Sequence, residues 1–115
     1  MSPRRHDRRV RDLRRSAPIF AALADQTRVT LLARLAGEPA LSIARLTQGS
    51  KLTRQAITKH LRVLEEAGLV RSIRAGRESR YELDAKPLDE ARQALEGVSR
   101  WWDEGLARLK ALVEA

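Results

Sequence analysis

Apolar residues recur at helical spacing over most of the chain. A short helix is predicted from Pro18 to about Asp25, with Ile19, Phe20 and Leu23 as its apolar face. Asp25 can cap a second helix that ends at Gly37. Because apolar residues cover most of its girth, this second helix should lie in the core. Ser42 can cap a short third helix, which ends near Gly49.

The fourth predicted helix spans residues 53–67, where Thr53 opens it and Gly68 with Leu69 closes it. At 100° per residue, four of its residues should face the core: Ile57, His60, Leu61 and Leu64. Only four residues separate this helix from the short helix before it. The two therefore form a candidate helix-turn-helix.

After Leu69 the apolar period changes from helical to alternating. Residues 70–74 and 80–83 are predicted as two strands, and residues 75–79 as the tip of a hairpin. Three arginines lie on the tip and its flanks: Arg74, Arg77 and Arg80.

A long final helix is predicted over about residues 86–114. Its apolar residues form one narrow stripe, widened on one flank by Trp101 and Leu112: Leu88, Ala91, Leu95, Val98, Trp102, Leu106, Leu109 and Val113. A domain this small cannot cover such a helix, so we expect a second copy of the chain to pack on it. The alternative is that the stripe folds back on the first helix of its own chain, and both contacts can coexist. The expected dimer interface consists of Ile19, Phe20, Leu23, Leu95, Val98, Trp101, Trp102, Leu106 and Leu109.

Residues 1–16 have a different composition, with Val10 and Leu13 as their only large apolar residues. They hold seven arginines and two aspartates, a net charge of +5. Such a segment cannot build a core, so we expect a mobile basic arm, followed by one folded domain over residues 17–115. The arm could enter a minor groove or add nonspecific attraction to phosphates, and the interrupting aspartates favour the second.

Length and composition narrow the class of protein further. The 115 residues suffice for one core, and no apolar run is long enough to cross a bilayer or to serve as a signal peptide, which indicates a cytoplasmic protein. There is no cysteine, so disulfides, thiolate metal sites and cysteine nucleophiles are excluded. Neither a catalytic constellation nor a phosphate-binding glycine loop is visible, so we expect no enzyme and no cofactor.

The net charge of +8 lies in two blocks, the arm and residues 51–80. In the second block, one face of the fourth helix collects Gln55, Thr58, Lys59 and Arg62, with Arg54 on its flank. Short polar groups near a helix start and cations further along suit a DNA major groove and its phosphates. A charge run alone would indicate a merely solvated face. Here the helix-turn-helix spacing, the basic hairpin and the local charge agree, and this agreement favours DNA.

The segments "ALADQTRVTLLARL" and "LTRQAITKHLRVLEEAGLVRSIRAGRESRYEL" resemble the ArsR/SmtB-type winged helix-turn-helix repressors, over about Phe20 to Ala115. The resemblance implies a mainly α fold with a small β-hairpin, and a homodimeric bacterial repressor that binds double-stranded DNA. It implies groove or phosphate contacts for Thr53, Arg54, Gln55, Thr58 and Lys59. It assigns Arg74, Arg77 and Arg80 to the wing, residues 74–80.

The sequence departs from the metal-sensing members of the family that it resembles. Many relatives bind metal through a cysteine pair on the first helix of the motif, or through Asp, His and Glu on the final helix. Here the first helix reads "SIARLTQ", and the final helix has no histidine. His60 is expected to be packed or to contact phosphate, and His6 lies in the arm. We therefore expect no metal, as in the cysteine-free branch of the family, and the sequence identifies no inducer.

The sequence thus predicts a dimeric repressor that binds an imperfect inverted repeat at its own promoter. The competing hypothesis is a protein-interaction adaptor with only nonspecific affinity for nucleic acid. RNA binding is disfavoured because few aromatic residues are available to stack on bases.

Overall fold

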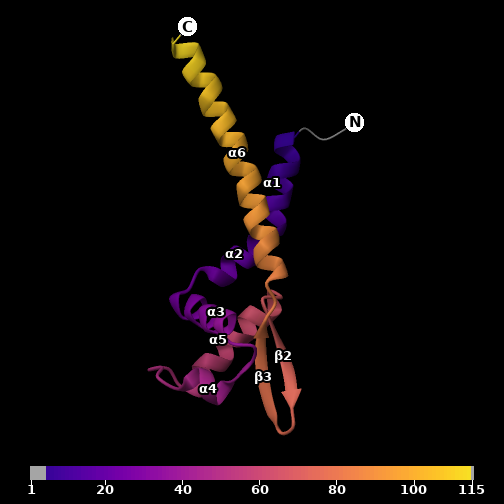
Figure 1. The fold of residues 1–115 in the computed structure, drawn as a ribbon, viewed down its shortest axis with the longest axis vertical. Coiled ribbons are helices and arrows are strands. Elements are labelled where there is room, and N and C mark those ends of the chain that lie inside the picture. The colour runs from indigo at the N-terminus through magenta and orange to yellow at the C-terminus, as the bar shows by residue number, and fades with distance from the viewer. Residues whose placement is uncertain (1–4, 115) are drawn as a thin grey trace.

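The computed structural model describes residues 5–114 and has the mainly α fold with a β-hairpin that the sequence predicts (Figure 1). The hairpin and the short helices form a head, from which one long helix rises. The elements in chain order are α1 (Arg5–Arg15), α2 (Ala17–Leu23), α3 (Gln26–Gly37), β1 (Leu41–Ser42), α4 (Ile43–Thr47), α5 (Arg54–Glu66), β2 (Val70–Ala75), β3 (Glu78–Leu83) and α6 (Lys86–Glu114).

Three of the helices begin at the caps that the sequence predicts. Asp25 Oδ2 accepts the backbone N–H of Arg28 at 3.0 Å, which opens α3. Ser42 Oγ accepts the N–H of Arg45 at 3.1 Å, and Thr53 Oγ1 accepts the N–H of Ala56 at 3.1 Å. Each bond satisfies an amide that has no partner within its own helix, so these positions fix where α3, α4 and α5 start.

The end of α5 is set by Gly68, whose φ of 79° lies in the left-handed region. The N–H of Gly68 donates to Glu65 O and the N–H of Leu69 donates to Leu64 O, both at 2.9 Å. This pair of bonds closes the helix, and the two leucine side chains that meet across it are fully buried. The chain is thereby directed from α5 into the hairpin.

The core lies in the head, between α3, α5 and the start of the hairpin. Its buried apolar residues are Ile19, Ala22, Leu31, Leu32, Leu35, Leu41, Leu46, Ile57, Leu61, Leu64, Leu69, Val70 and Ala91. The predicted inner face of α5 is confirmed for Ile57, Leu61 and Leu64, whereas His60 is half-buried at the edge. Only the first turns of α6 join this core, through Leu88 and Ala91.

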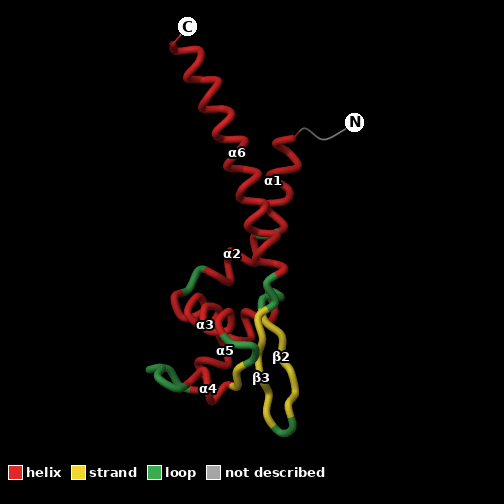
Figure 2. The backbone as a smooth tube through the Cα atoms, viewed as in Figure 1, coloured by secondary structure: helices red, strands yellow, loops and turns green. Residues whose placement is uncertain are grey.

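The sheet has three strands in the order β1-β3-β2, all antiparallel. The predicted hairpin is present, but its strands are longer than expected. Ala75 pairs with Glu78, so only Gly76 and Arg77 form the tip, where five residues were expected (Figure 2). Strand β1 was not predicted, because two residues carry no readable alternation. It pairs Leu41 with Tyr81 and attaches the start of α4 to the wing.

Where we expected a mobile arm, the structure has the helix α1. It lies alongside α6, at the end of the molecule opposite the hairpin (Figure 1). Arginine is a good helix former, and a neighbouring helix gives Leu13 a half-buried place, which the sequence of the segment alone did not reveal. Residues 1–4 of the expected arm lie outside the described residues.

The far half of α6 continues past the end of α1, and no other described helix or strand lies beside it (Figure 1). The helix has 29 residues. Its apolar side chains there stay in solvent, with Trp102 at 62% and Leu112 at 76% of full exposure. A single chain therefore leaves most of the predicted stripe uncovered.

Candidate nucleic-acid interface

The outer face of α5 presents the polar residues that the sequence assigns to DNA. Thr53, Arg54, Gln55, Lys59 and Arg62 are exposed and Thr58 is half-buried. The hydroxyl of Thr58 donates to the carbonyl of Arg54 at 2.7 Å, so its one proton is used inside the helix. In contrast, the amide of Gln55 forms no hydrogen bond within the described residues and remains available to a ligand.

The three wing arginines are exposed but differ in their surroundings. The Nε of Arg74 donates to Gly76 O at 3.1 Å, which ties this side chain to the turn. Arg80 pairs with Glu78 at 3.0 Å, so part of its charge is neutralised. Arg77 stands at the tip and has no ion pair within residues 5–114. It is therefore the wing cation with the most freedom to reach a phosphate.

A hollow of about 420 Å³ connects α5 with the wing. Arg54 and Arg77 both line it, together with the start of α4, where Ser42 and Ala44 lie. The hollow places the N-terminal end of α5 and the wing tip on one side of the molecule, as a duplex would require. The sequence analysis did not include the start of α4 in this surface, although it predicted the start of that helix from its cap, Ser42.

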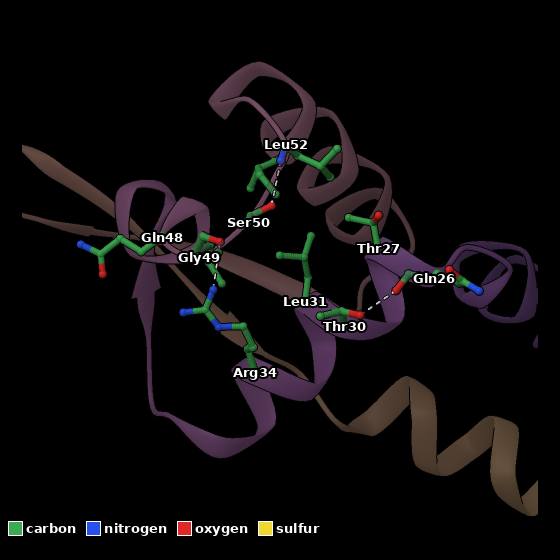
Figure 3. A pocket seen from close by; sticks show the side chains of 11 residues that line it. Gln26, Thr27, Thr30, Leu31, Arg34, Gln48, Gly49, Ser50 and Leu52 are labelled. Atoms are coloured by element: carbon green, nitrogen blue, oxygen red, sulfur yellow. Dashed lines mark hydrogen bonds between the residues drawn. The ribbon is translucent and has the colours of Figure 1, made fainter.

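A second hollow of about 410 Å³ lies between α3, the α4–α5 turn and α5 (Figure 3). Its floor is apolar, with Leu31, Leu46 and Ile57. The guanidinium of Arg34 donates from Nη1 to Leu46 O at 2.9 Å and from Nη2 to Arg45 O at 3.1 Å. Since α4 has only five residues, these bonds hold its last carbonyls and fasten the helix-turn-helix to α3. Sequence reasoning missed this role of Arg34.

His60 connects the inner edge of α5 to the start of α3. Its Nδ1 lies 3.7 Å from Asp25 Oδ2. The hydrogen bond from the N–H of Arg28, and then the charge of His60, hold the pKa of the Asp25 carboxyl below its usual value. His60 thus packs toward the protein, as one of the sequence expectations proposed, and not outward with Gln55 and Lys59.

The residues predicted for a dimer interface fall into two groups. Ile19 is buried in the core of its own chain, with 7% exposure, and has little surface left for a partner, while Phe20 and Leu23 are half-buried. Along α6, Val98 is half-buried and five residues are exposed: Leu95, Trp101, Trp102, Leu106 and Leu109. Of the stripe on α6, only the start folds onto the core of the same chain, and the contact with a second chain stays a prediction.

Residues 5–114 contain no group of three or more His, Cys, Asp or Glu side chains arranged to hold a metal ion. Within the same residues, no helix combines the length and the apolar character needed to cross a membrane.

Comparisons with known proteins agree with this architecture. A helix-turn-helix domain family matches residues 23–73. The chain is 35% identical over 96 residues to the HTH-type transcriptional regulator Rv2034 of Mycobacterium tuberculosis, covering 84% of this chain and 86% of that one. It is 32% identical over 97 residues to the arsenic resistance transcriptional regulator ArsR1 of Pseudomonas putida, covering 84% and 65%.

Among solved structures, an ArsR-like transcriptional regulator from Rhodococcus sp. RHA1 matches with a TM-score of 0.77 and 38% identity. The match covers 84% of this chain and 91% of the Rhodococcus chain.

The fold and the exposed face of α5 define a winged helix-turn-helix protein that binds DNA. The chain belongs to the ArsR family of transcriptional regulators. It contains no cysteine, which places it with the cysteine-free members that the sequence indicated. The relatives named above are transcriptional regulators.

Proposed function

We propose that the protein is a homodimeric repressor that binds an inverted-repeat operator, in the cytoplasm of a bacterium, through α5 and the wing. The observation that carries the proposal is the shared hollow of Arg54 and Arg77, which brings the start of α5 and the wing tip to one side. A duplex placed there meets α5 in its major groove and the wing on the flanking backbone.

Within this complex the residues of α5 have separate tasks. Gln55, close to the start of the helix and with a free amide, reads a base edge, and adenine offers the bidentate partner for it. Thr58 has committed its proton to Arg54 O and therefore offers its methyl group or an oxygen acceptor. The cations Arg54, Lys59 and Arg62, with Arg74, Arg77 and Arg80 of the wing, neutralise phosphates.

Dimerisation is supported by the exposed stripe of α6. Two chains that pack along Trp102, Leu106 and Leu109 would remove large apolar side chains from water, which stabilises association. A symmetric pair then presents two recognition helices to two half-sites. Occupation of the operator blocks the polymerase at the promoter.

We further propose that no metal ion controls this repressor. ArsR1 of Pseudomonas putida is named for arsenic resistance, but the present chain has no thiol with which to bind a soft metal. Its two histidines, His6 and His60, are far apart in the sequence, and His60 faces Asp25.

The experiment is fluorescence anisotropy with the DNA upstream of the protein's own gene and with a scrambled duplex, over a series of salt concentrations. A specific repressor binds its own DNA more tightly, roughly 10³-fold or more, and keeps this preference as salt rises. Equal binding to both duplexes that disappears with salt would show charge attraction alone and would favour the protein-interaction adaptor.

A further inference from the structure

Helix α1 carries five arginines with described side chains that the contacts proposed above do not use: Arg8, Arg9, Arg11, Arg14 and Arg15. None of them pairs with a carboxylate in the described part of the chain. The neighbouring helix α6 offers Glu96, but the carboxylate of Glu96 is bonded to Arg92 at 2.6 Å. Helix α1 therefore carries a dense positive charge, which Asp7 and Asp12 of the same helix offset only in part.

Three of these arginines form one stripe along α1. Arg8, Arg11 and Arg15 follow one another at spacings of three and four, so they lie within about 60° of each other around the helix. All three are exposed. Arg9 instead faces α6, since its Cγ is 3.9 Å from the point where a Cβ on Gly97 would stand. The three side chains thus stay accessible while α1 rests on α6, although Arg15 also lines a hollow between the two helices with Asp12, Glu90 and Glu96.

The position of the stripe separates it from the recognition surface. The structure is 67 Å long, with the wing near one end and α1 beside α6 toward the other (Figure 1). A duplex bound to α5 and the wing lies across the lower end of the head. Helix α1 lies on the opposite side of the head from the wing tip (Figure 1), so its arginines are not part of that surface.

We propose that Arg8, Arg11 and Arg15 form a second surface for double-stranded DNA, so that the protein can hold two duplexes at once. The proposal goes beyond the regulator function and depends on it only for the first duplex. The arginines of α1 would contact phosphates without reading bases, because guanidinium groups on a helix face suffice to neutralise a charged backbone.

The chemistry of α1 favours DNA over other anionic partners. A membrane-binding helix needs a broad apolar face, and α1 has only Val10 and Leu13, of which Leu13 is half-buried in the fold. A specific protein partner is usually anchored by aromatic or large apolar residues in the centre of the contact, and the stripe has none. A polyphosphate backbone requires only closely spaced cations.

The test uses an immobilised duplex carrying the upstream DNA, to which the full-length protein binds, and a fluorescent scrambled duplex added afterwards. We compare the wild type with the triple variant Arg8→Gln, Arg11→Gln, Arg15→Gln. Glutamine has nearly the helix propensity of arginine, so α1 should persist, and circular dichroism checks this. The matched control removes the same charge elsewhere, by Lys86→Gln, Arg108→Gln, Lys110→Gln.

The stripe variant should bind the immobilised duplex as the wild type does. It should capture at least roughly tenfold less of the second duplex, and the salt dependence of that capture should have a slope smaller by about 3. The control should retain both. The proposal is overturned by equal capture in wild type and stripe variant, by no capture in the wild type, or by an equal loss in the control. It is also overturned if the stripe variant loses the first duplex or becomes monomeric in light scattering.

Failure of the main function gives a different pattern. The variant Lys59→Gln, Arg62→Gln should lose the immobilised duplex. Suppose instead that Lys59→Gln, Arg62→Gln binds the immobilised duplex like the wild type and the stripe variant binds no DNA. Then α1, and not α5, is the surface that binds the first duplex.

Discussion

His60 Nδ1 lies 3.7 Å from Asp25 Oδ2, the same carboxylate oxygen that accepts the backbone N–H of Arg28 at 3.0 Å. One aspartate therefore caps α3 and contacts the recognition helix α5. This contact links the orientation of α5 to the start of α3 through a pair of titratable side chains.

The first prediction concerns pH. The pKa of Asp25 is lowered by the Arg28 N–H and by the charge of His60. A carboxyl with a lowered pKa in the folded state stabilises the fold above its unfolded pKa, and this contribution disappears as pH falls through the folded pKa. Asp25→Asn retains a good cap without the charge. The wild type should melt at a higher temperature than Asp25→Asn at pH 7, and the difference should begin to shrink near pH 4 and disappear only as pH falls through the lowered pKa of Asp25. A difference in melting temperature that does not shrink as the solution is made more acidic than about pH 4 would contradict the role of the charge.

The second prediction compares two neighbours on α5. Leu64 is fully buried, whereas Val63 is 38% exposed. Leu64→Ala should lower the free energy of unfolding by about 2 to 5 kcal/mol, because it leaves a cavity in the core. Val63→Ala should change it by less than about 1 kcal/mol. Urea denaturation measures both, and similar losses in the two variants would contradict the burial pattern.

The third prediction makes the same substitution at two glycines with opposite results. At Gly68 a Cβ has room, 3.8 Å from Pro87 Cγ, but the φ of 79° disfavours alanine by about 1 to 2 kcal/mol. At Gly97, inside α6, alanine should stabilise the helix by about 1 kcal/mol, since the nearest side-chain atom is 3.9 Å away. Thermal melts of Gly68→Ala and Gly97→Ala should shift in opposite directions. A stabilising Gly68→Ala would mean that α5 ends differently.

The fourth prediction separates base reading from phosphate contact. Gln55→Ala should weaken binding to the preferred duplex by about 1 to 3 kcal/mol and relax the preference at one base pair of each half-site. Arg62→Gln should weaken binding to all duplexes alike and reduce the salt slope by about 1 for each half-site bound. Selection from random duplexes with each variant measures the preferences. Unchanged preferences in Gln55→Ala would remove this residue from the readout.

The fifth prediction concerns the pair of chains. Trp102→Asp with Leu106→Asp should give the mass of a single chain in light scattering and greatly weaken operator binding, because charge replaces apolar surface on the stripe. Ala107→Asp with Ala111→Asp places the same charge on the exposed side of the helix opposite the stripe. This control variant should remain dimeric. A dimeric Trp102→Asp, Leu106→Asp variant would show that the interface lies elsewhere.

Much of this structure follows from local signals in the sequence. Asp25, Ser42, Thr53 and Gly68 each satisfy backbone groups at a helix end, and their side chains or glycine character identify those ends in the sequence. The buried face of α5 is also a local signal, because residues three and four apart lie on the same side of a helix.

The features that the sequence did not reveal depend on distant partners. β1 exists because Leu41 and Ser42 pair with Tyr81 and Arg80 of β3, and two residues have no pattern of their own. Helix α1 depends on α6 as a neighbour. Arg34 holds α4 by donating to backbone carbonyls. Every residue has such a carbonyl, so the sequence of α4 does not indicate this contact.

The junction between the wing and α6 is short. Only Asp84 and Ala85 separate β3 from α6, and hydrogen bonds hold them: the N–H of Asp84 donates to Leu69 O at 2.8 Å and the N–H of Lys86 donates to Asp84 Oδ1 at 3.1 Å. The joint thus has few free torsions, and α6 is about 43 Å long. In a pair of chains joined through α6, the crossing angle of the two helices fixes the distance between the two heads. One base pair inserted between half-sites adds about 3.4 Å and rotates one of them by about 35°. A stiff joint does not absorb such a change, so for the proposed dimer we expect the spacing of the half-sites to be specified to a single base pair.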